Sequence, residues 1–141
     1  MKTTQDKSRY AVMFVLLVTF IGCGKPSNQS IQGHWTGSKA KDSSYSCTVS
    51  IIGNRLEYRG ANSNDWARGT VVIRENMKPM EMDLTVLEPA SESNHMMLAI
   101  YQIKDDKLTV AISDTMRPAD FSLNGAADVA NFRRDSNSIS R

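Results

Sequence analysis

Short segments in which apolar and polar residues alternate fill most of the chain between residues 31 and 135. A period of two residues predicts β-strands, because successive side chains of a strand point to opposite faces of a sheet. The strictest alternation covers residues 80–86, and a hairpin is predicted over residues 47–58, where Gly53 and Asn54 supply a two-residue turn. No segment keeps a helical period for more than about two turns. The pattern therefore predicts an all-β domain.

Further strands are predicted on both sides of these segments. They are expected at residues 35–39, 69–73, 97–103, 107–112 and 128–134, with Asp105 and Asp106 forming a hairpin turn between the third and fourth. About eight strands at a spacing of about 8 to 12 residues are typical of antiparallel barrels and sandwiches. Since a closed barrel has no exposed edge strand, we expect a small antiparallel up-and-down barrel, with a sandwich as the alternative.

The first 22 residues have the layout of a secretory signal peptide. Lys2, Lys7 and Arg9 precede an apolar run from residue 10 to residue 21, which ends in small residues. The run is shorter than the ~20 residues that a membrane-spanning helix needs. We therefore favour export over a permanent transmembrane helix.

The end of this leader resembles the bacterial lipobox, in which a cysteine follows aliphatic and small residues. The segment reads Phe20-Ile21-Gly22-Cys23, with Phe20 in place of the usual leucine. The resemblance implies that Cys23 is lipidated and anchors the protein in the cell envelope, whereas ordinary cleavage near Gly22 is the alternative. The predicted organisation is a signal peptide at 1–22, a lipidated cysteine and tether at 23–30, the barrel at 31–135 and a disordered tail at 136–141.

Cys47 is the second cysteine of the chain. It alternates with Val49 and Ile51, which places it on the apolar face of the first predicted hairpin. An exported domain could pair its two cysteines, but Cys23 lies beside a segment that nothing holds near a strand. We therefore expect Cys47 to be free and buried.

Charge gives no indication of a nucleic-acid partner. The chain has 17 basic and 15 acidic residues, and the first ten positions hold three of the basic residues and one of the acidic ones. The rest of the chain is therefore neutral. A neutral domain with interspersed charges lacks the basic surface that nucleic-acid binding requires, so no nucleic-acid partner is expected.

Both ends of the predicted domain resemble lipocalin-like barrels. Gly33-His34-Trp35 looks like the Gly-x-Trp that opens the first strand of such barrels. Arg133 or Arg134 is similar to the arginine that covers this tryptophan from the last strand. The resemblance implies that Gly33, Trp35 and one of these arginines close one end of the barrel.

Four blocks of the chain also resemble a family of conserved domains of unknown function that is abundant in planctomycete bacteria. The blocks are Gln32–Trp35, then Arg68–Thr70 with Lys78–Leu84, then Ala99–Ile103 with Asp106–Leu108, and finally Arg117–Phe121. The four blocks occur in this order and together span nearly the whole predicted domain. The resemblance implies a lipocalin-like barrel, often exported, with no established activity and no catalytic residues to carry over.

No metal or cofactor site is predicted from the sequence. The chain has two histidines, His34 and His95, and a catalytic zinc site usually takes more than one such ligand. His95 and the methionines near it could be soft ligands for Cu(I). However, Met80 and Met82 fall in the inward phase of a strand, which favours packing in the core.

No catalytic residues are predicted either. Glu81 and Asp83 share one strand face, and paired carboxylates can act as acid and base. Their positions belong to the polar phase of the strand, so an ordinary solvated face is the simpler interpretation. The sequence shows no Ser-His-Asp order, no glycine-rich phosphate loop and no Cys-His pair of recognisable spacing.

The long connection between residues 113 and 127 holds the most distinctive polar motif, which includes Arg117, Asp120 and Phe121. It is too long for a plain hairpin loop. It is expected to form either a lid over the barrel mouth or a plug in it, with Phe121 inside and Arg117 paired with Asp120 or a strand carboxylate. We favour the plug, because so small a barrel should have little interior volume.

The leading functional hypothesis is a lipid-anchored envelope protein whose barrel is a binding or interaction module. Its expected partners are the membrane, through the N-terminal lipid, and a small hydrophobic ligand or an envelope protein. The alternatives are an exported enzyme that acts at the barrel mouth and a purely structural envelope component. A sizeable cavity would favour the first two hypotheses, and a filled barrel the third.

Overall fold

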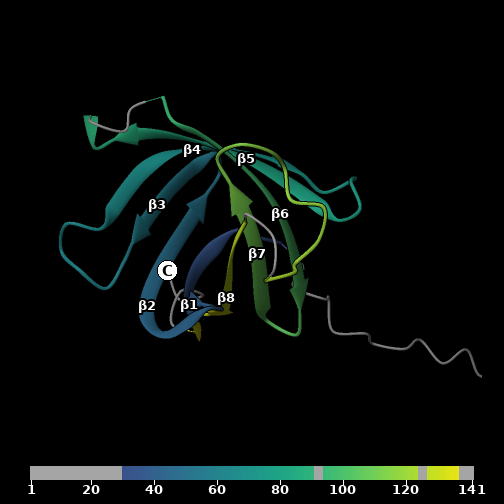
Figure 1. The fold of residues 1–141 in the computed structure, drawn as a ribbon, viewed down its shortest axis with the longest axis horizontal. Helices are drawn as coiled ribbons and strands as arrows, with labels where there is room; N and C mark the ends of the chain where they lie inside the picture. Colours follow the sequence, from purple (N-terminus) through teal and green to yellow (C-terminus); the bar gives the residue numbers. More distant parts are fainter. Residues whose placement is uncertain (1–29, 91–93, 124–126, 137–141) are drawn as a thin grey trace, which may run out of the picture.

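A computed structural model describes residues 30–90, 94–123 and 127–136 of the chain. These residues form a closed barrel of eight antiparallel strands, in which each strand pairs with its neighbours in sequence and β1 pairs with β8 (Figure 1). The predicted all-β up-and-down barrel is therefore confirmed. The strands are β1 (Gly33–Lys39), β2 (Asp42–Ile52), β3 (Arg55–Arg59), β4 (Trp66–Arg74), β5 (Met80–Glu88), β6 (Met96–Lys104), β7 (Lys107–Ser113) and β8 (Asp128–Arg134).

Tight turns set the register of the predicted hairpins. Gly53 has a φ of 62° between β2 and β3, and Asp105 and Asp106 have φ values of 50° and 58° between β6 and β7. Two-residue hairpin turns need such positive φ angles, which glycine and aspartate adopt more readily than bulky residues. The turns place Ile51 opposite Leu56 on the inward side of the first hairpin.

Strand β2 starts earlier than the sequence pattern predicted. Its first residues, from Asp42 to Ser46, are mostly polar, so they lack the apolar alternation that marks a half-buried strand. They are held instead by pairing with β1, in which Ser46 lies opposite Ser38 and Asp42 opposite Lys39. Hairpin pairing with β1 thus extends this strand beyond the apolar alternation that begins at Cys47.

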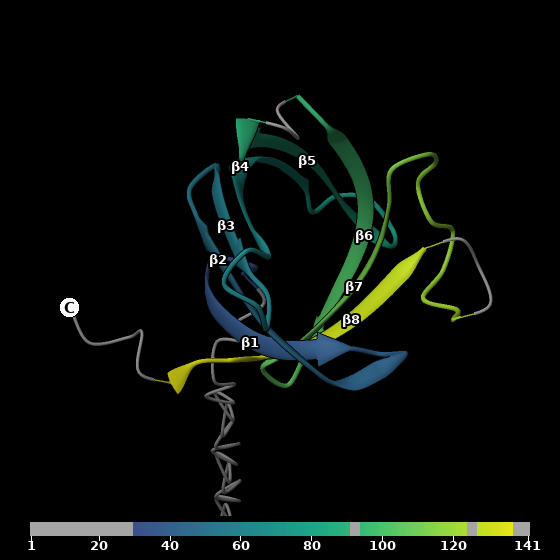
Figure 2. The ribbon, with the colours of Figure 1, turned by 60° about the vertical axis from the view of Figure 1, so that its left-hand side comes forward.

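Closure of the barrel requires a close approach between β1 and β8. Gly37 lies opposite Phe132, and a Cβ atom at this glycine would collide with the backbone of Asn131. The absence of a side chain therefore allows the first and last strands to meet. Figure 2 shows β1 and β8 side by side where the ring of strands closes.

The interior of the barrel is a continuous apolar core. Its buried members are Ile31, Trp35, Cys47, Ile51, Leu56, Val71, Met82, Leu84, Ala99, Tyr101, Leu108, Val110 and Phe132. Strands β1, β3, β5 and β7 end, and β2, β4, β6 and β8 begin, at one end of the barrel, which we call the mouth. The opposite end carries the turns β2–β3, β4–β5 and β6–β7, and we call it the closed end.

In the part of the chain that the structure describes, no helix has the length and apolarity needed to cross a membrane.

Candidate functional site

Trp35 fills the closed end of the barrel. Its side chain is fully buried, and its indole N–H donates a hydrogen bond of 2.8 Å to the carbonyl oxygen of Ile31. The guanidinium of Arg134 lies 4.1 Å from the centre of the Trp35 ring. The same guanidinium donates hydrogen bonds to the carbonyl oxygens of Gln32 at 2.7 Å and Ser30 at 2.6 Å. The segment that enters β1 is thereby fastened across this end.

Of the two arginines considered from the sequence, the structure places Arg134 on Trp35. Arg133 is exposed on the outer face of β8, since neighbouring strand residues point to opposite sides. Gly33 has a φ of 122°, and a Cβ atom there would lie 3.1 Å from the Arg134 guanidinium. Glycine thus allows both the backbone turn and the approach of the arginine.

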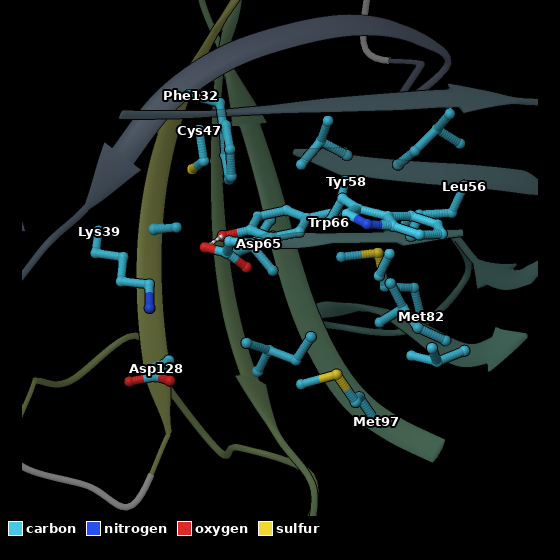
Figure 3. A pocket seen from close by; sticks show the side chains of 18 of the residues that line it. Lys39, Cys47, Leu56, Tyr58, Asp65, Trp66, Met82, Met97, Asp128 and Phe132 are labelled. Carbon is cyan, nitrogen blue, oxygen red and sulfur yellow. Dashed lines mark hydrogen bonds between the residues drawn. The ribbon is translucent and has the colours of Figure 1, made fainter. Parts of the chain in front are cut away.

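A cavity of about 340 Å³ extends from the mouth into the barrel interior, toward inward residues near the closed end such as Ile51, Leu56 and Leu108. Its walls are mostly apolar, and Figure 3 shows Leu56, Met82 and Met97 among them. The expectation of little interior volume was therefore wrong. The physical reason is side-chain size, because inward positions such as Ala67, Ala130 and Val110 carry small groups. The apolar lining comprises Val49, Ile51, Leu56, Ala67, Met82, Leu84, Val86, Met97, Leu108, Val110, Ile112, Ala130 and Phe132, with Cys47, Tyr58 and Trp66.

Polar groups line the cavity at the mouth. Lys39 comes from the end of β1, Asn64 and Asp65 from the β3–β4 connection, and Asp128 from the start of β8. Asn64 and Asp128 are exposed to solvent while they line the cavity. The cavity therefore opens to solvent at this end, whereas Trp35 seals the other.

Two tyrosines and a carboxylate form a hydrogen-bonded chain at the mouth. The hydroxyl of Tyr58 donates to Oδ2 of Asp65 at 3.3 Å, and the hydroxyls of Tyr45 and Tyr58 are 3.2 Å apart. Since the Tyr58 proton is directed at Asp65, Tyr45 is the donor of the second bond. Burial, with a smaller contribution from Cys47, raises the pKa of Tyr58 to about 12. Tyr58 is therefore a neutral hydrogen-bond donor at physiological pH.

Gly60 makes room for this chain. Its N–H donates to the carbonyl oxygen of Asp65 at 2.6 Å, which folds the β3–β4 connection into a compact loop. A Cβ atom at Gly60 would collide with the Asp65 carboxylate and the Tyr45 hydroxyl. The loop therefore needs glycine to bring Asp65 over the barrel interior.

Cys47 is buried and free, as the sequence pattern predicted. Its residue is 3% exposed, and its side chain lines the cavity beside Phe132 (Figure 3). Burial raises the pKa of the Cys47 thiol, and nearby Lys39 offsets part of this increase. Little of the thiol is therefore in the reactive thiolate form at neutral pH.

We expect iodoacetamide to alkylate Cys47 slowly in the folded protein and rapidly in urea. Any ligand that fills the cavity should slow the native reaction further, because the sulfur lines the same space. Mass spectrometry of time points measures both rates. Equal rates in the folded and unfolded protein would contradict this placement of the thiol.

The connection between β7 and β8 lies on the outer wall of the barrel and not in its mouth, as Figure 2 shows. Phe121 packs against Ile100, Ala111 and Val129, which point outward between the inward residues of their strands. Asp120 is exposed and accepts a hydrogen bond of 2.8 Å from the Ser122 N–H. The lid or plug expected at the mouth, with Phe121 inside, was therefore wrong, because the outer faces of β6, β7 and β8 are themselves apolar. The expected pairing of Arg117 with a strand carboxylate is confirmed.

Arg117 attaches this connection to the carboxylates of β5. It pairs with Glu81 at 3.3 Å and with Asp83, and it donates a hydrogen bond of 2.7 Å to the carbonyl oxygen of Ala99. Arg74 pairs with the same two carboxylates. The side chains of Glu81 and Asp83 are 19% and 18% exposed. The expected solvated face was therefore wrong, since two arginines cover it.

This ion-pair cluster makes stability depend on pH. Hydrogen bonds from Arg74 and then Arg117 lower the pKa of Asp83 from 3.8 to about 2, against the opposing effect of burial. Because the folded-state pKa is the lower one, the stabilisation is complete above about pH 4 and is lost as the pH falls toward 2. We expect Asp83→Asn to remove about 1 to 2 kcal/mol of this acid-dependent stability. Urea titrations of both proteins at pH 5 and pH 2.5 measure it, and equal losses on acidification would contradict it.

The other residues considered from the sequence do not meet at one site. His34 and His95 are both exposed, and they lie at opposite ends of the barrel, on β1 and beside the β5–β6 connection. Within the described ranges, no group of three or more His, Cys, Asp or Glu residues could hold a metal ion. The polar residues at the mouth were not identified from the sequence. A tyrosine in the inward phase of β3 was the available signal, since it places a hydroxyl inside the barrel.

Comparison with known proteins does not assign this chain to a family. No protein-family model matches the chain, and neither does any curated protein or any solved structure. The cavity and its lining are therefore the basis for assigning a function.

Proposed function

We propose that this protein is a binding module whose barrel holds a small, mostly apolar ligand. The observation that supports the proposal is the cavity of about 340 Å³, with apolar walls and polar groups at one end. Ligand sites in proteins are typically concave, about 300 to 1,000 Å³ in volume and lined mainly by apolar side chains with a few polar groups. This arrangement favours ligand binding over a purely structural barrel.

We further propose that the module is exported and anchored in the cell envelope by a lipid on Cys23. The support is the charged, apolar and small-residue order of residues 1–22 and the lipobox-like segment that ends at Cys23. These residues lie outside the part of the chain that the structure describes. Membership of the planctomycete domain family is part of the same proposal, and the closed barrel is consistent with it.

Cys23→Ser should release the domain from the membrane or leave it uncleaved. Stable residence requires more than one acyl chain, since a single chain binds membranes only marginally. Membrane fractionation and intact-mass measurement of the variant test this expectation, with Cys47→Ser as the matched control that keeps Cys23. The lipid anchor would be contradicted if Cys23→Ser were still found in the membrane fraction and still carried the same covalently added mass as the wild type.

Native mass spectrometry of the protein purified from its own envelope tests the binding function. We expect a non-covalent adduct that dissociates on collisional activation and is absent after unfolding and refolding in ligand-free buffer. Conversion of an added ligand would instead reveal the alternative function, an enzyme that acts at the mouth. A mass equal to the polypeptide with its covalent modifications, and nothing more, would contradict ligand binding in that envelope.

A further inference from the structure

At the mouth, the lining of the cavity holds more carboxylates than ammonium groups. Asp65 and Asp128 supply two carboxylates and Lys39 one ammonium to the lining of the same cavity. Figure 3 shows these three residues on one side of the cavity and the apolar residues Leu56 and Met82 on the other. The cavity is therefore amphipathic, with a charged end and an apolar end.

Hydrogen-bond directions make the charged end rich in acceptors. The Tyr58 proton is given to Asp65, and the Tyr45 proton is given to Tyr58. The second carboxylate oxygen of Asp65 accepts no bond from the described residues, and neither does either oxygen of Asp128. Asp65 is partly buried and Asp128 is exposed at the mouth, and a charged donor binds a carboxylate more strongly than a neutral donor does.

Lys39 does not neutralise these carboxylates by direct contact. Its ammonium lies 4.5 Å from the centre of the Tyr45 ring, and no ion pair within 4.0 Å joins it to Asp65 or Asp128 in the described ranges. The position of Lys39 shows that the aromatic wall of the mouth accommodates a cation. It also leaves the two carboxylates available to a second cation.

We propose that the ligand is a cationic amphiphile, with an aliphatic amine or ammonium head at Asp65 and Asp128 and an apolar body in the cavity. This inference rests on the proposed binding function and names the chemical class of its ligand. A carboxylate head would meet one ammonium and two repelling carboxylates. A neutral head would leave the carboxylates without a charged donor.

Competition binding tests this ligand class. The protein is loaded with a neutral fluorescent probe, N-phenyl-1-naphthylamine, and titrated at neutral pH with octylamine, octanoate or octanol, which share one apolar chain. We expect octylamine to displace the probe at a concentration at least about tenfold lower than octanoate, as a charge-assisted hydrogen bond would produce. Equal or better displacement by octanoate would overturn the proposal.

Variants at the mouth provide a second test, in which the direction of the change in affinity distinguishes a cationic head from a carboxylate head. The double variant Asp65→Asn with Asp128→Asn should bring the amine-to-carboxylate ratio close to one. Lys39→Met should strengthen octylamine binding, because it removes a repelling charge, whereas it would weaken binding if a carboxylate were the true head. Asp105→Asn at the closed end is the matched control, since asparagine also accepts the positive φ there. An unchanged ratio in the double variant would overturn the proposal.

Octanol distinguishes a failure of the cationic head from a failure of the binding function. If octanol displaces the probe but octylamine and octanoate are equivalent, the barrel binds apolar ligands and only the cationic head is wrong. If the probe does not bind, or if no competitor displaces it, the binding function itself fails.

Discussion

Replacing Trp35 by alanine should lower the free energy of unfolding by about 3 to 5 kcal/mol, the range for truncating a buried tryptophan. The side chain is fully buried, and its loss leaves a cavity at the closed end. The change also removes the hydrogen bond to Ile31 and the contact with Arg134, which contributes about 0.5 to 2 kcal/mol beyond area burial. Urea titration followed by circular dichroism measures the effect.

Trp66→Ala is the matched control for this variant. Trp66 lies at the mouth, where it is half-buried and lines the cavity, so its truncation enlarges a space that already exists. We expect a smaller loss of stability than for Trp35→Ala. A loss below about 1 kcal/mol for Trp35→Ala would show that this end of the barrel does not depend on the tryptophan.

Ala130→Phe should weaken ligand binding strongly without unfolding the protein. Ala130 points into the barrel from β8 and lines the cavity, so a benzyl group there would occupy the space that the ligand needs. Overpacking a well-filled core costs about 1 to 3 kcal/mol, but here the added ring enters a cavity. We expect affinity for N-phenyl-1-naphthylamine to fall at least about tenfold, which corresponds to 1.4 kcal/mol.

Val72→Phe is the matched control, because it introduces the same ring on the outer face of β4. Val72 is 57% exposed, and its side chain does not contribute to the cavity. Affinity for the probe should therefore remain at the wild-type value. If both variants bind the probe as the wild type does, the probe does not enter the barrel.

The strand pattern was predictable because it depends on local alternation. Residues 80–86 alternate strictly, and β5 places Met82, Leu84 and Val86 inside the barrel. The start of β2 was not predictable in this way, because Asp42 to Ser46 are mostly polar and pair with β1, and Tyr45 alone among them packs against the core. Alternation identifies half-buried strands, and it does not identify strand ends whose residues are mostly polar.

The site depends on side-chain volumes and on contacts between residues that are distant in sequence. The alternation of apolar and polar residues contains neither kind of information. Alternation assigns Ala130 to the inward face, but only the packed barrel shows that its small size, together with that of Ala67, leaves a cavity. Asp65 reaches Tyr58 because the loop at Gly60 folds back over the interior. Arg117, which covers Glu81 and Asp83, lies in a connection more than thirty residues farther along the chain. The strand pattern alone does not reveal this contact, so the polar face of the strand was interpreted as solvated.

A methyl-resolved NMR titration with N-phenyl-1-naphthylamine tests whether the barrel interior receives a ligand. We expect saturable shifts at one equivalent for the cavity methyls of Leu84, Met97 and Val110. The methyls of Ile52 and Val72, which are 59% and 57% exposed on the outer face, should stay unchanged. Shifts confined to the outer methyls, or no shifts at a saturating probe concentration, would contradict the claim.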